Sequence, residues 1–149
     1  MDNVRDAIER EIFIRAGIER VWSLVSRVGF WVGDDLHFDH EAGEGDLVVI
    51  ETETYGNFPV RVERLDAPRY AAYRWASGFP GSTPVDGNST LVEFTLQELD
   101  GGVLVQVRES GFSKLQVAEG VRQSLYADNA GGWIAQIQAL ARVGEEVTV

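Results

Sequence analysis

A change of hydrophobic period between residues 107 and 117 decides the order of elements along the chain. Residues 90–107 are TLVEFTLQELDGGVLVQV, in which apolar and polar residues alternate on both sides of a turn at Asp100-Gly101-Gly102. Residues 117–143 are VAEGVRQSLYADNAGGWIAQIQALARV, with apolar residues at helical spacing at Val121, Leu125, Trp133, Ile137 and Leu140. Alternation indicates strands, whereas a 3.6-residue period indicates a helix. We therefore expect two antiparallel strands and then a C-terminal helix from about residue 117 to beyond Leu140.

The preceding residues add a strand, a short helix and further strands. Strand patterns cover Ile8–Arg15, Leu47–Tyr55, residues 58–63 and Tyr70–Trp75, and a short amphipathic helix is expected over Ile18–Val25. Gly56-Asn57 predicts a hairpin turn, and Ser77–Asn88 a loop. Strands segregated from helices predict an α+β fold. We expect a curved antiparallel sheet of about six strands wrapped around the long helix.

Composition limits the classes of function. The 149 residues fit one domain, 44% are hydrophobic, and the net charge is -11. An excess of acid argues against binding nucleic acid or anionic membranes. The chain has no cysteine, no secretory signal and no apolar run of membrane-spanning length, so we expect a cytoplasmic protein without membrane insertion. We expect no cofactor.

The glycine pair inside the predicted helix is unusual. Gly131 and Gly132 together lower helix stability by roughly 2 kcal/mol relative to alanines, or divide the helix in two. Such a cost usually has a packing reason, so we expect close approach to the sheet or to a ligand.

Both histidines lie in one acidic segment, residues 34–41. Converging His and carboxylate side chains can bind a metal. His37 and His40 have no fixed relative geometry in an irregular segment, so we expect a solvated, mobile loop and no metal. A hydrolase triad is not indicated, because the Gly-x-Ser-x-Gly motif is absent.

Two acids provide the candidate catalytic groups. Glu51 and Glu53 share one face of a predicted strand, with Tyr55 following. Buried, one of them would have a raised pKa and could act as an acid or base; exposed, both are surface charges. Periodicity does not decide between these alternatives, and we expect both to be exposed.

Polar residues interrupt the apolar stripe of the C-terminal helix. Asn129 and Gln136 fall among Leu125, Trp133 and Leu140, where they either bond to the facing sheet or orient a ligand in a cavity. Aromatic residues on several elements either fill the core or line such a cavity. Together these give the predicted ligand-binding set: Trp31, Phe38, Tyr55, Tyr73, Trp75, Phe94, Asn129, Trp133 and Gln136.

Short segments in a fixed order resemble a known family. Residues 8–16 (IEREIFIRA) and 18–22 (IERVW), Phe58–Val62, Tyr70–Trp75 and Gly132-Trp133 resemble the activator of heat-shock protein 90 ATPase homologue-like family, in the START/polyketide-cyclase-like (SRPBCC) superfamily. The resemblance covers essentially the whole chain. It differs at Gly17, where the family usually has proline, which implies a less rigid entry to the first helix.

The resemblance implies a helix-grip fold with an internal cavity, in a superfamily that binds lipids, hormones and polyketides and includes cyclases and dehydratases. We expect a small hydrophobic ligand between the sheet and the C-terminal helix, with no enzymatic activity. The alternatives are a polyketide cyclase- or dehydratase-like enzyme using Glu51, Glu53 and Tyr55, and a chaperone-related interaction module whose protein partner is unknown. The family's eukaryotic co-chaperones carry an additional N-terminal domain, for which we expect no room here.

Overall fold

The computed structural model describes residues 6–146 as six strands, two α-helices and one short 3₁₀ helix. The elements in chain order are β1 Ala7–Ile14, α1 Ile18–Val25, β2 Leu47–Thr52, β3 Gly56–Asp66, β4 Tyr70–Trp75, β5 Thr90–Leu99, β6 Gly102–Ser110, η1 Phe112–Lys114 and α2 Glu119–Gly144. The predicted α+β class and element order are confirmed. The C-terminal helix is continuous across Gly131 and Gly132.

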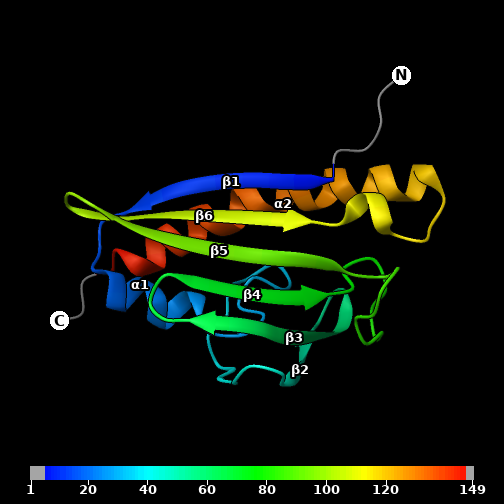
Figure 1. Ribbon diagram of the computed structural model, residues 1–149, viewed down its shortest axis with the longest axis horizontal. Coiled ribbons are helices and arrows are strands. Elements are labelled where there is room, and N and C mark those ends of the chain that lie inside the picture. The colour runs from blue at the N-terminus through cyan, green and yellow to red at the C-terminus, as the bar shows by residue number, and fades with distance from the viewer. Residues whose placement is uncertain (1–5, 147–149) are drawn as a thin grey trace.

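The strands form one antiparallel sheet with the order β1-β6-β5-β4-β3-β2. Consecutive strands from β2 to β6 are neighbours in the sheet, joined by short turns except for the long loop between β4 and β5, and β1 completes the sheet beside β6. In Figure 1, α2 lies behind β1 and β6, and its C-terminal end lies next to α1. This is the helix-grip arrangement that the sequence predicts.

Alternation gives the sheet one apolar and one polar face. On β5, Val92, Phe94 and Leu96 are buried, and on β6 the same holds for Val103, Val105 and Val107. The opposite face carries charged side chains that pair across strands, such as Arg108 with Glu9 and Glu93. These exposed ion pairs contribute little to stability. Burial of the apolar face against α1, α2 and the segment between α1 and β2 therefore provides the main stabilisation.

The two halves of α2 pack differently. All of its buried residues lie in the C-terminal half: Trp133, Ile137, Leu140, Ala141 and Gly144. In the N-terminal half Leu125 is half-buried, and Val121, expected on the apolar stripe, is 48% exposed. The helix is therefore held firmly at one end and covers the sheet loosely at the other.

The glycine pair does not serve a close approach to the sheet, which was one of the two expected reasons; the other, approach to a ligand, stays a prediction. A Cβ atom added at either Gly131 or Gly132 would meet no atom within 4 Å, so neither glycine permits a close backbone approach. The glycines thus leave open space beside the loosely packed half of α2.

The turn after β2 also differs from the expectation. The strand ends at Thr52, residues 53–55 form the turn, and β3 begins at Gly56. The positive φ of Gly56 (93°) and a hydrogen bond from the Tyr55 amide to the Thr52 hydroxyl (2.9 Å) fix this turn. Glu53 therefore lies outside the strand, and Glu51 and Glu53 are not an in-register pair on one strand face.

Within residues 6–146, no helix combines the length and the apolar character needed to cross a membrane.

We predict that Gly17→Pro stabilises the protein by about 0.4–1 kcal/mol, because proline restricts the unfolded chain without straining the native one. Gly17 has φ -71° and precedes the first residue of α1, and an added Cβ meets no atom within 4 Å. Urea unfolding measures the change. As a contrast, Gly29→Ala should destabilise, since Gly29 has φ +68° and its added Cβ would lie 2.5 Å from Ile50. A destabilising Gly17→Pro would contradict the prediction.

Candidate functional site: an aromatic cleft beside α2

A cleft of about 680 Å³ lies beside the middle of α2, where the helix faces the sheet. The helix contributes Leu125, Asp128, Asn129, Gly132, Trp133, Ala135 and Gln136. The opposite walls come from residues 31–34 after α1, from Tyr55 in the β2–β3 turn, from Phe58 on β3, from Trp75 at the end of β4, and from Ser77, Gly78 and Pro80. This volume is within the range of small-molecule sites.

Aromatic rings form a continuous wall of the cleft. Trp31 contacts both Trp75 and Trp133, with ring centroids 5.7 Å apart in each pair, and Phe58 contacts Trp75 at 5.8 Å. Trp31 and Trp133 are each 3% exposed, so neighbouring groups hold both rings in place. The wall is therefore a rigid apolar surface rather than a set of mobile side chains.

A buried carboxyl group lies behind this wall. Glu109, on β6 between Ile8 and Val92, is fully buried and does not itself line the cleft. Its oxygens accept hydrogen bonds from the indole nitrogens of Trp133 (2.8 Å) and Trp75 (3.0 Å). They also accept from the Thr90 hydroxyl (2.6 Å) and from the Asn129 amide nitrogen (3.1 and 3.2 Å). Three of these four donors belong to cleft-lining residues, so Glu109 fixes the orientation of the wall.

Burial raises the pKa of Glu109 above its ordinary value. The hydrogen bonds from Thr90, Trp133, Trp75 and Asn129 oppose this shift by stabilising the charged form. No lysine or arginine contacts this carboxyl group among the described residues. Its charge is therefore balanced by neutral dipoles alone.

Both predicted polar residues of α2 lie on the cleft wall and both have partners. Asn129 donates to Glu109 and to the Ser77 hydroxyl (3.0 Å). Gln136 donates to the carbonyl oxygens of Trp31 (2.8 Å) and Gly33 (2.9 Å). These bonds tie the loop carrying Trp31 to the helix, so the two residues hold the cleft walls together.

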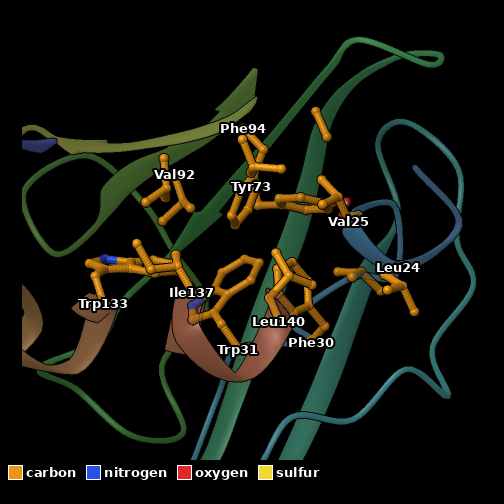
Figure 2. Packing of buried hydrophobic residues seen from close by; sticks show 14 of the residues in the cluster. Leu24, Val25, Phe30, Trp31, Tyr73, Val92, Phe94, Trp133, Ile137 and Leu140 are labelled. Atoms are coloured by element: carbon orange, nitrogen blue, oxygen red, sulfur yellow. The ribbon is translucent and has the colours of Figure 1, made fainter. Parts of the chain in front are cut away.

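The predicted aromatic set divides between cleft and core. Trp31, Tyr55, Trp75 and Trp133 line the cleft. Tyr73 and Phe94 are fully buried, Phe38 is half-buried and stacks on Phe30, and none of the three lines the cleft. Figure 2 shows Phe30 and Trp31 in one cluster with the sheet residues Tyr73 and Phe94 and the helix residues Ile137 and Leu140. The side chains after α1 thus fill the middle of the helix-grip interior and leave the cleft at one end.

The predicted acids and histidines lie beside the cleft. Glu51 and Glu53 are exposed and line a second, smaller cavity of about 290 Å³, together with Asp34, Asp35 and His37. His37 and His40 are half-buried rather than fully solvated, and Nε2 of His37 donates to the Val32 carbonyl oxygen (2.9 Å). Over residues 6–146, no three His, Asp or Glu side chains are placed to hold a metal ion together.

Sequence reasoning missed Glu109, although a signal was present. The alternation of Val103, Val105 and Val107 places these residues on the inner face, and two residues further along the same face is Glu109. A carboxylate on an inner face is rarely buried unless it has hydrogen-bond partners. The partners of Glu109 are distant in sequence, so the local pattern does not reveal them.

The comparisons with known proteins agree with this fold. Residues 15–145 match the family described as Activator of Hsp90 ATPase homolog 1-like protein. The chain belongs to this family. It shares the START-like fold of the SRPBCC superfamily, as the sequence predicts. A comparison with curated proteins gives no match.

Solved structures of family-like proteins superpose over most of the chain. The solution structure of Bacillus halodurans BH1534 is 24% identical with a TM-score of 0.70, covering 97% of this chain and 100% of that one. The Aha1 dimer from Colwellia psychrerythraea is 16% identical with a TM-score of 0.71, covering 95% and 97%. DynU16, from the dynemicin biosynthetic locus, is 20% identical with a TM-score of 0.68; the match covers 93% of this chain but 46% of DynU16. At these identities, the similarities establish the shared fold.

We predict that Glu109→Ala lowers the free energy of unfolding by about 3 kcal/mol or more, because it leaves several buried donors without an acceptor. Urea unfolding followed by tryptophan fluorescence measures this and also reports on the two indole rings. The matched control is Glu98→Ala, an exposed glutamate on β5 paired with Arg69, which should change stability by less than about 1 kcal/mol. Equal effects of the two substitutions would show that the buried network is not stabilising.

A second prediction concerns pH. Because the folded-state pKa of Glu109 is raised, the folded protein binds the Glu109 proton more tightly than the unfolded chain does. This stabilising contribution is fully present below the unfolded pKa, ordinarily 4.5, and is lost as pH rises through the folded value. The free energy of unfolding of the wild type minus that of Glu109→Gln should therefore fall as the pH rises above about 4.5. A difference that rises with pH would contradict the raised pKa.

Proposed function

We propose that this protein binds a small, largely apolar molecule in the aromatic cleft and does not transform it chemically. The observation that carries the proposal is the rigid wall of Trp31, Trp75 and Trp133, which borders about 680 Å³ of unfilled space. Concave sites of several hundred Å³ with mostly apolar and aromatic walls are typical of small-molecule binding. A cleft of this size with fixed aromatic walls is therefore better suited to a ligand than to stability.

The residues that the cyclase or dehydratase alternative invokes are poorly placed to act as an acid or base on a molecule in the cleft. An enzyme needs a titratable group within hydrogen-bonding reach of the reacting atom. Glu51 and Glu53 are exposed, and Tyr55, which is 51% exposed, donates its hydroxyl hydrogen to Asp34 (2.8 Å). Glu109 is shielded from the cleft by the groups that bond to it. Binding without catalysis is therefore the better interpretation of this arrangement.

The chaperone-related alternative has one supporting feature. Leu47 and Val49 are 43% and 48% exposed on β2, which is an edge strand of the sheet. Exposed apolar edge strands are possible sites for pairing with another chain. We rank this role second, because it makes no use of the cleft. We also propose that the protein is cytoplasmic and that it consists of a single domain.

We predict that Gly132→Leu lowers the affinity of the neutral fluorophore phenylnaphthylamine by about tenfold or more, since the side chain would occupy the cleft. Gly132 lines the cleft, and an added Cβ there meets no protein atom within 4 Å. Fluorescence titration measures the affinity. Gly131→Leu is the matched control: both glycines are exposed and the change in helix propensity is equal, but Gly131 does not line the cleft, so binding should be unchanged. Unchanged binding in Gly132→Leu would place the ligand elsewhere.

A further inference from the structure

The charged groups around the aromatic cleft all have the same sign. Asp34 and Asp128 line the cleft, and its described lining includes no lysine, arginine or histidine. Glu109 adds a third carboxyl group directly behind Trp75 and Trp133. A bound carboxylate or phosphate would find no compensating positive charge here, whereas a cation would be attracted.

The acidic character continues into the second cavity. That cavity shares Val32, Gly33, Asp34 and Tyr55 with the aromatic cleft, so the two spaces adjoin. Its charged lining is Asp34, Asp35, Glu51 and Glu53, with His37 as the one basic group. An elongated molecule could therefore place its apolar body against the tryptophans and a charged arm beside these carboxylates.

Trp75, the partly exposed tryptophan of the aromatic wall, is suited to a cation. Indole faces carry negative electrostatic potential and attract ammonium groups within about 6 Å of the ring centre. Trp75 and Trp133 both donate their N–H groups to the Glu109 carboxyl group, which polarises the rings further toward electron-rich faces. Shape, wall chemistry and surrounding charge thus favour the same kind of molecule.

We propose that the ligand is an organic cation: an apolar or aromatic body that carries a protonated amine. Its body lies in the aromatic cleft, and its amine lies near Asp34, where the two cavities meet. This assignment deepens the proposed function and rests on the cleft being a ligand site.

The test uses three probes that share one aromatic body. Naphthylmethylamine is a cation near neutral pH, naphthylmethanol is neutral and naphthoate is an anion. Calorimetric titration of the full chain should give affinity in the order cation, neutral, anion, with about a tenfold difference between cation and anion at low salt. The difference should shrink at high salt, because exposed charges are then screened.

Charge-removing variants locate the effect. Asp34→Asn keeps an acceptor for the Tyr55 hydroxyl and should weaken cation binding about threefold, while naphthylmethanol binding stays unchanged. The control is Asp100→Asn, which makes the same change in net charge in the β5–β6 turn, away from both cavities, and should affect neither probe.

The outcomes separate the two proposals. If naphthylmethanol binds but the amine binds no more tightly, or naphthoate binds best, the assignment of a cationic ligand is wrong and the binding function stands. Equal losses of cation affinity in Asp34→Asn and Asp100→Asn would also overturn the assignment, because the effect would then be one of net charge. If none of the three probes binds, both proposals fail.

Discussion

The carboxyl group of Glu109 determines how the sheet and the helix α2 pack against each other. It accepts hydrogen bonds from β4 and β5 through Trp75 and Thr90, and from α2 through Asn129 and Trp133. A buried carboxyl group without partners is strongly destabilising, so these donors must converge for the fold to form. That requirement fixes the spacing between the helix and the sheet, and with it the width of the cleft. The network is therefore both a structural constraint and the support of the candidate site.

The interior of the fold is divided by the segment that follows α1. Phe30 and Trp31 insert between the sheet and the C-terminal half of α2, where Trp31 contacts Tyr73, Trp75, Phe94 and Trp133. Aromatic side chains bury more surface than other residues, so this insertion provides much of the core. It also closes the middle of the space under the helix. The remaining space lies at the end where α2 carries Asn129, Gly132 and Leu125 in place of large buried side chains.

Local pattern was sufficient to predict the elements but not the distances between them. The period change predicts the start of α2 to within about two residues of its observed start at Glu119. The prediction succeeds because apolar residues recur at every turn of a helix that packs on one side. Alternation put Tyr73 and Phe94 on the inner face correctly, yet the inner face is shared by core and cleft. Which of the two a residue meets depends on the loop carrying Phe30 and Trp31, whose irregular path has no period. Glu109 illustrates the same limit, since the pattern gives its direction while its four partners come from other elements.

The glycines of α2 connect stability with the cleft. Gly132 weakens the helix by about 1 kcal/mol relative to alanine, and no described atom packs within 4 Å of the position its Cβ would take. A position that served only the fold would gain from a larger residue, both through helix propensity and through buried apolar area. Asn129 and Gln136 follow the same logic, because each replaces an apolar residue on the inner stripe by a group that bonds to the cleft walls. Gly131, which is exposed like Gly132 but does not line the cleft, shows that a glycine alone does not mark a site. Gly132 differs because the space beside it is bounded by tryptophan rings whose orientation Glu109 fixes. The residue that weakens the helix therefore lies next to a surface already organised for binding.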